Sequence, residues 1–143
     1  MCKHFNGNNL WSLVIILFVF ADVLHFILGM NIVVRGSQSK NECLGVWAYI
    51  LIASLVSFIG FINKTKIVYS LVKNDYISIK NNLIFYFIAS LAVLVWGSFI
   101  YYFGDTSSCF NNYKKNYKDI WHYFLITYWY FVAQMCAVPA IIA

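Results

Sequence analysis

One apolar run constrains this chain more than any other feature, the stretch LWSLVIILFVFADVLHFILGMNIVV at residues 10–34. About 20 apolar residues at a rise of 1.5 Å span a hydrocarbon core about 30 Å thick, so this run is long enough to cross a bilayer as a helix. A secretory signal peptide would offer Val19 and Ala21 as a small-residue cleavage site, but the apolar run continues well past Ala21. The run therefore predicts a membrane helix.

Three further apolar runs follow, at residues 44–62, 83–103 and 120–142. The chain of 143 residues is 62% hydrophobic and 10% charged, whereas soluble domains carry about 25% charged residues. Because the polar connections are short, successive helices must run in opposite directions. We therefore expect an all-α fold with one domain over residues 1–143. We expect this domain to be an integral membrane four-helix bundle with up-down-up-down antiparallel topology and short loops.

Two of the connections between the apolar runs are long enough to form structure of their own. The segment 63–82 is the longest, and its apolar residues recur at helical spacing among lysines. This pattern predicts extensions of the flanking helices or a short amphipathic helix at the lipid surface. The segment 104–119 is expected to be a polar loop.

The cysteines decide the expected orientation, because the positive charges do not. Lys and Arg divide five against five between the terminal side with connection 63–82 and the side of loops 35–43 and 104–119: Lys3, Lys64, Lys66, Lys73 and Lys80 against Arg35, Lys40, Lys114, Lys115 and Lys118. Cys43 and Cys109 both fall on the second side, and such a pair is typical of a disulfide in an oxidising compartment. We therefore expect a Cys43–Cys109 disulfide, extracellular or lumenal loops 35–43 and 104–119, and cytosolic termini. Two free thiols facing a reducing compartment are the alternative.

A family resemblance rests on the order of several short segments. ILGMNIVV ends the first run, NECLGVWAYIL opens the second, VLVWGSFIYYF closes the third, and SSCFNNY precedes the aromatic IWHYFLITYWYF. In this order the chain resembles the small four-helix membrane proteins grouped with transmembrane protein 272. The resemblance covers most of the chain and implies the four-helix fold. It implies no activity for any residue.

Asp22 and His25 lie near the middle of the first run, one helical turn apart, and so share a face. An ionised carboxylate facing lipid costs at least about 2.5–3.5 kcal/mol, so Asp22 must face protein, water or a partner, or stay protonated. Counting at 1.5 Å per residue places Ser54 and Gln134 at a similar depth to Asp22, and Thr127 and Tyr130 share a face with Gln134. The predicted intramembrane polar cluster is Asp22, His25, Ser54, Thr127, Tyr130 and Gln134.

Three interpretations of this cluster stay open. The cluster fixes the register of the helices, or it lines a proton or ion pathway, or Asp22 meets a cationic or amide group on a neighbouring subunit. If the role is structural, Asp22→Asn is expected to fold and assemble nearly normally.

Small residues mark the surfaces where helices approach closely. Ala53, Ser57 and Gly60 fall on one face of the second run, and glycines of the first and third runs add to them. The predicted helix-packing residues are Gly29, Ala53, Ser57, Gly60 and Gly97. We expect the small-residue face of the second run and the aromatic fourth run to be the surfaces used in lateral assembly.

Motifs for catalysis or metal binding are missing from the sequence. It has no Gly-rich phosphate loop, no serine elbow, and no CxxC or HxxxH spacing, and an Asp–His pair without a nucleophile is poor evidence for hydrolysis. We therefore expect neither an enzyme nor a catalytic, cofactor or metal site. The +5 net charge forms no contiguous basic stripe, so nucleic acid is not an expected partner, and no soluble small-molecule substrate is evident.

These observations favour a non-enzymatic membrane protein that acts as a structural or assembly component through lateral helix contacts. Its expected partners are the lipid bilayer and either copies of itself or a larger membrane complex. The alternative is an oligomeric ion or proton channel that uses Asp22 and His25.

Overall fold

The computed structural model describes residues 6–38, 44–73, 75–103 and 108–142, and its regular structure over these ranges is helical. The all-α class is therefore confirmed. The helices are α1 (Asn6–Arg35), α2 (Leu44–Lys73), α3 (Tyr76–Phe103), α4 (Ser108–Asn116) and α5 (Lys118–Ile142). The sequence has one proline, Pro139 near the end of α5. Before that point, therefore, no proline removes a backbone N–H from the hydrogen bonds of the long helices.

In the part of the chain that the structure describes, three helices are long and apolar enough to cross a membrane, over Leu13–Arg35 of α1, Gly45–Ser70 of α2 and Ile77–Tyr102 of α3. This confirms a chain with membrane-spanning character. Within the described residues α5, which is 25 residues long, is not among these candidate spans.

The helices differ from the predicted ranges where polar residues were expected to end them. α2 continues past Ile62 to Lys73, and α3 begins at Tyr76, so the connection 63–82 is mostly extension of the flanking helices. The Asp75 carboxylate accepts a hydrogen bond of 3.2 Å from the Ser78 amide, which caps the start of α3.

The expectation of a loop over 104–119 was wrong where α4 lies. The side chain of Tyr113 is fully buried and that of Phe110 partly so, while neighbouring polar residues of α4 are exposed. α4 is thus an amphipathic helix held by its apolar face. It packs against α5.

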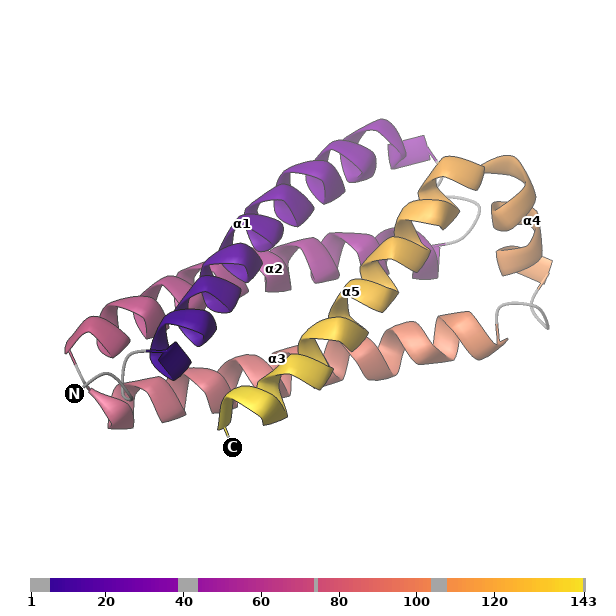
Figure 1. The fold of residues 1–143 in the computed structure, drawn as a ribbon. Coiled ribbons are helices and arrows are strands. Elements are labelled where there is room, and N and C mark those ends of the chain that lie inside the picture. The colour runs from indigo at the N-terminus through magenta and orange to yellow at the C-terminus, as the bar shows by residue number, and fades with distance from the viewer. Residues whose placement is uncertain (1–5, 39–43, 74, 104–107, 143) are drawn as a thin grey trace.

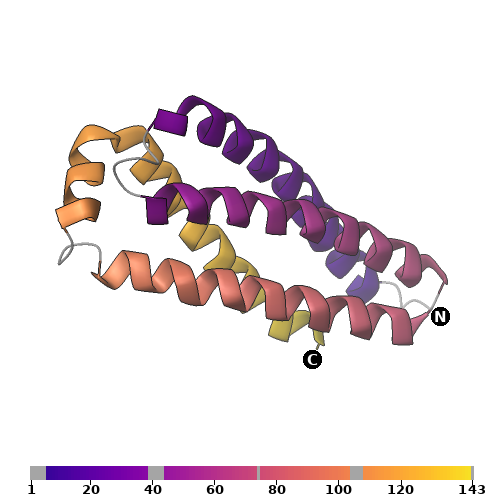
Figure 2. The same ribbon diagram turned by 180° about the vertical axis from the view of Figure 1, so that it is seen from behind.

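The four long helices alternate in direction along the chain (Figure 1). α2 packs between α1 and α3, and α5 crosses them on the other side and contacts all three (Figure 2). α4 lies across the end of the molecule where α3 ends and α5 begins (Figure 1). Helices distant in sequence therefore enclose one interior.

Aromatic rings fill the half of this interior nearer α4. The Tyr49 ring lies edge-on to Phe124 and Trp96, with centroids 5.2 and 5.7 Å away. Gly97 permits this packing, because a Cβ there would lie 2.6 Å from the Tyr49 hydroxyl oxygen. The indole of Trp47 donates a hydrogen bond of 3.0 Å to the Val33 carbonyl and joins the start of α2 to the end of α1.

The Cys43–Cys109 disulfide stays a prediction, because Cys43 and the side chain of Cys109 lie outside the described residues. We expect peptide mass mapping without reduction to recover the two cysteines in one linked species. Cys136 on α5 is an exposed free thiol and serves as the internal control for alkylation. Alkylation of both loop cysteines would contradict the bond and the orientation inferred from it.

Candidate functional site

Asp22 of α1 is fully buried, and its partner is Lys64 of α2. Lys64 lies on the same face of α2 as Ser57 and Gly60, since residues four and three apart line one side of a helix. Its ammonium donates hydrogen bonds to Asp22 Oδ2 and, over 2.8 Å, to Gln134 Oε1 of α5. The two charges therefore meet inside the bundle.

The remaining polar atoms around this ion pair come from α3 and α5. The Tyr130 hydroxyl donates to Asp22 Oδ1 over 2.5 Å, and Gln134 Nε2 approaches the same oxygen at 3.5 Å. The Tyr86 hydroxyl of α3 donates to Gln134 Oε1. We call the five residues Asp22, Lys64, Tyr86, Tyr130 and Gln134 the polar layer; they come from all four long helices.

Aromatic rings complete the surroundings of the Lys64 ammonium. Its nitrogen lies 4.1 Å from the centroid of the Tyr86 ring and 5.7 Å from that of Phe18. A cation over a ring face is stabilised by the negative electrostatic potential of that face. The buried charge thus meets a carboxylate, an amide oxygen and two rings.

His25 lies one turn along α1 and uses both ring nitrogens. Nδ1 is 2.8 Å from Ser57 Oγ of α2, and Nε2 is 2.9 Å from Thr127 Oγ1 of α5. The imidazole stacks on Tyr123 and Tyr130 with centroids 5.5 and 5.2 Å apart. Tyr130 therefore connects His25 to the other residues of the polar layer.

Glycines allow these side chains to come together. A Cβ on Gly60 would lie 2.4 Å from a ring carbon of Tyr86 and 3.0 Å from Asp22 Oδ2. A Cβ on Gly29 would lie 1.9 Å from the hydroxyl oxygen of Ser54. The close approach of α2 to its neighbours depends on these missing methyl groups.

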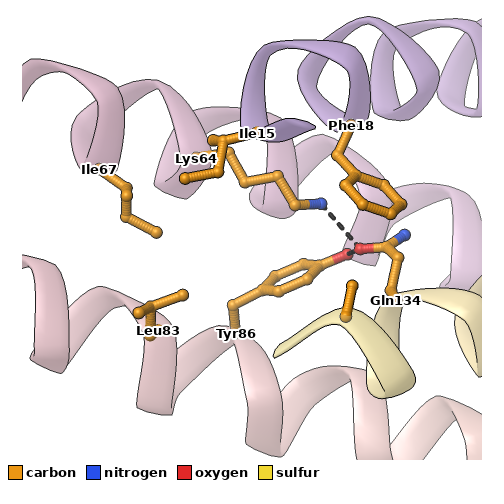
Figure 3. A pocket seen from close by; sticks show the side chains of 8 residues that line it. Ile15, Phe18, Lys64, Ile67, Leu83, Tyr86 and Gln134 are labelled. Atoms are coloured by element: carbon orange, nitrogen blue, oxygen red, sulfur yellow. Dashed lines mark hydrogen bonds between the residues drawn. The ribbon is translucent and has the colours of Figure 1, made fainter. Parts of the chain in front are cut away.

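A small cavity of about 30 Å³ adjoins the polar layer (Figure 3). Its walls include Ile15, Ile67 and Leu83, and Lys64, Tyr86 and Gln134 also border it. The polar atoms of these last three residues turn toward one another instead of into the cavity (Figure 3). The wall that this space presents is therefore apolar, which does not favour water there.

The predicted cluster is largely assembled, with one exception. Asp22, Tyr130 and Gln134 lie in the polar layer, and His25 and Thr127 bond to one another beside it. Ser54 is buried but donates to the Ile50 carbonyl of its own helix at 2.7 Å, so the prediction that it joins the cluster was wrong. A serine in a helix readily forms this bond to the carbonyl four residues earlier.

The small-residue face of α2 points inward. Ala53, Ser57 and Gly60 are all buried within the chain, and Gly29 and Gly97 are also buried. The expectation that this face of α2 serves lateral assembly was therefore wrong. The exposed faces of the helices carry large apolar side chains instead.

Three participants were not predicted: Lys64, Tyr86 and the hydroxyl of Ser57. Lys64 was assigned to a polar connection because the apolar run ends at Ile62. The signal that would have found it is its spacing, since residues 53, 57, 60 and 64 form one continuous helical face. Tyr86 lies among many aromatic residues and has no comparable signal.

Loss of the Tyr130 hydroxyl is expected to weaken the fold measurably. Tyr130→Phe removes a hydrogen bond to a buried carboxylate, and we expect the free energy of unfolding to fall by about 1–2 kcal/mol. Tyr102→Phe is the matched control, because Tyr102 is 70% exposed on α3, and it should change little. Denaturation in mixed micelles measures both; equal effects would exclude a special role for Tyr130.

Comparison with known proteins gives no further guide. No family model matches the chain, and no curated protein and no solved structure matches it significantly. Among the described residues, His, Cys, Asp and Glu side chains do not gather in groups of three or more that would hold a metal ion. Function must therefore be inferred from the geometry.

Proposed function

We propose that this chain is a non-enzymatic, four-span integral membrane protein with a structural or assembly role exerted through lateral helix contacts. In this proposal α5 is the fourth span, and the bundle has up-down-up-down topology. The polar layer locks the register of the helices within one subunit. The outward faces of the helices then contact lipid, other copies of the chain or a larger membrane complex.

The observation that carries the proposal is that the polar layer is closed within one chain. Both carboxylate oxygens of Asp22 accept hydrogen bonds, and Lys64 meets partners from α1 and α5. A buried charge pair with its hydrogen bonds satisfied needs no ligand for stability. This favours register locking over the hypothesis that Asp22 pairs with a neighbouring subunit.

The outer surface of the bundle fits lateral contact. Large apolar side chains on α1, α3 and α5 are more than half exposed, among them Leu17, Phe20, Phe85, Ile88 and Trp129. Such a surface in a membrane contacts acyl chains or another helix.

The orientation is part of the proposal and now depends on the cysteines alone. With Lys64 inside the bundle, the terminal side keeps Lys3, Lys66, Lys73 and Lys80, four positive residues against five on the other side. Cytosolic termini and extracellular or lumenal loops 35–43 and 104–119 follow from the proposed disulfide. The resemblance to the proteins grouped with transmembrane protein 272 agrees with this arrangement in fold only.

The number of copies per particle tests the proposal. We expect single-molecule photobleaching of the fluorescently labelled chain in native membrane vesicles to count two or more copies per particle. If the partner is a larger membrane complex instead, we expect the chain to migrate in mild detergent as part of a particle of defined size. Tyr102→Phe, which leaves the interior unchanged, provides the control for labelling and expression. Single, uncomplexed copies at all expression levels would contradict the proposal.

The channel is the second candidate, favoured by one observation. Tyr130 bonds to Asp22 and stacks on His25, so titratable groups follow one another along the interior. Reconstitution in liposomes with an internal pH dye separates the two candidates. The structural role predicts no flux above empty liposomes, whereas proton flux that is lost in the double variant Asp22→Asn with Lys64→Gln, which keeps more of its stability than either single variant, would establish the channel.

A further inference from the structure

A hollow of about 270 Å³ lies where the end of α1 meets the start of α5, and we call it the α1–α5 hollow. It is larger than the cavity of about 30 Å³ beside the polar layer, and charged side chains of both signs border it. Its lining includes Ile32, Arg35, Gln38, Tyr117, Asp119 and Ile120. The fold thus brings together two segments that lie about 80 residues apart in the sequence.

Each of the two charges in this lining suits its own helix end. Arg35 lies in the last turn of α1 and Asp119 in the first turn of α5. A cation is stabilised by the partial negative charge at a helix C-terminus, and a carboxylate by the partial positive charge at an N-terminus. The helix ends explain each charge by itself, but they do not explain why both charges border the same hollow.

Arg35 and Asp119 border the α1–α5 hollow without bonding to each other. Both side chains are exposed, and the ion pair found among the described residues is that of Asp22 with Lys64. A guanidinium and a carboxylate that stay apart can each take an opposite charge from the same ligand. The lining therefore fits a zwitterion better than an ion of a single sign.

The hollow lies at the level where a bilayer has its headgroups. Arg35 is the last residue of the candidate span Leu13–Arg35, and the end of α1 and the start of α5 lie at the same end of the molecule (Figure 1). Ile32 precedes Arg35 by one turn of α1, and Ile120 follows Asp119 on α5. A ligand there meets charges at its polar end and apolar side chains on the membrane side, as an amphiphile requires.

We infer that the α1–α5 hollow binds the headgroup of a zwitterionic phospholipid. Arg35 binds the phosphate, because a guanidinium donates two parallel hydrogen bonds to such a group. Asp119 binds the amine at the other end of the headgroup. Ile32 and Ile120 contact the glycerol and the first methylene groups of the acyl chains.

Two nearby lysines make an anionic lipid the competing ligand. Lys115 and Lys118 border an adjoining hollow, which Asp119 also lines. Basic residues attract anionic lipids to a surface, but neither lysine borders the α1–α5 hollow. There an anionic headgroup offers no positive group to the Asp119 carboxylate, so a zwitterion is favoured.

Lipid binding to the purified full chain tests this inference. We expect native mass spectrometry from mild detergent to show tighter binding of phosphatidylethanolamine than of phosphatidylglycerol with the same acyl chains. Asp119→Asn should weaken binding of the first lipid about three- to tenfold and leave the second unchanged, so that the preference is lost. Arg35→Gln should weaken binding of both lipids, because both carry a phosphate.

Matched controls separate this site from general surface charge. Lys115→Gln removes an exposed positive charge outside the hollow and should leave phosphatidylethanolamine binding unchanged. Asp75→Asn removes an exposed carboxylate before α3 and should keep the preference. Equal losses in Arg35→Gln and Lys115→Gln, or equal binding of the two lipids to the unaltered chain, would overturn the inference. Displacement of the lipid by an equal concentration of glycerophosphoethanolamine, which has no acyl chains, would overturn it in favour of a soluble ligand.

The inference rests on the proposed function, because it takes α5 as a membrane span. Alkaline carbonate extraction of membranes that contain the chain distinguishes the two failures. A chain that stays in the membrane pellet but lacks the lipid preference would overturn the lipid site alone. A chain released into the soluble fraction would contradict the proposed membrane bundle and the lipid site with it.

Discussion

Asp22→Asn and Lys64→Gln are each expected to lower the free energy of unfolding by about 3 kcal/mol or more, whereas the double variant should lose less than either. Each single change leaves one buried charge without its counter-ion, and breaking such a pair costs about 3–5 kcal/mol. The double variant removes both charges and keeps amides that reproduce hydrogen bonds of the polar layer. This differs from the expectation from sequence that Asp22→Asn would fold nearly normally, because Lys64 faces the carboxylate in the same chain.

Denaturation of the four proteins in mixed micelles completes this double-mutant cycle. Lys66→Gln is the matched control, because Lys66 is exposed on the same helix two residues away, and it should change stability by no more than about 0.5 kcal/mol. Additive losses in the double variant would show that Asp22 and Lys64 do not act as a pair.

Gly60→Ala is expected to destabilise the bundle by about 1–3 kcal/mol, although alanine favours a helix by about 1 kcal/mol over glycine. The added methyl group would lie 2.4 Å from the Tyr86 ring, which bonds to Gln134 and cannot retreat without breaking the polar layer. Both α2 and α3 must shift to admit it. The loss of packing then outweighs the gain in helix propensity.

Two comparisons define the cause of this loss. Gly45→Ala is the matched control on α2, because its methyl group would meet the Phe110 ring at 3.4 Å, an ordinary contact, and it should be neutral or slightly stabilising. In a Tyr86→Ala background the cost of Gly60→Ala should largely disappear. A cost that persists there would mean that the ring is not the obstacle.

Sequence by itself determined the helical class and the membrane-spanning character of this chain. Both follow from lengths of apolar residues, since a helix that satisfies its own backbone is the structure that a 25-residue apolar run adopts in lipid. The sequence also predicted which polar residues face the interior, because a charge or an amide in an apolar run must turn away from lipid. These residues are Asp22, His25, Thr127, Tyr130 and Gln134.

Tertiary structure alone decided which of these residues meet. Lys64 follows the end of an apolar run and had the sequence pattern of a surface lysine, and only the inward turn of α2 pairs it with Asp22. Ser54 lies at the predicted depth, yet it bonds to its own helix because rotation about the helix axis, as well as depth, sets what a side chain contacts. The hydropathy of the sequence indicates how deep a residue lies along its own helix. Which side chains contact each other depends on how the four helices are rotated about their axes.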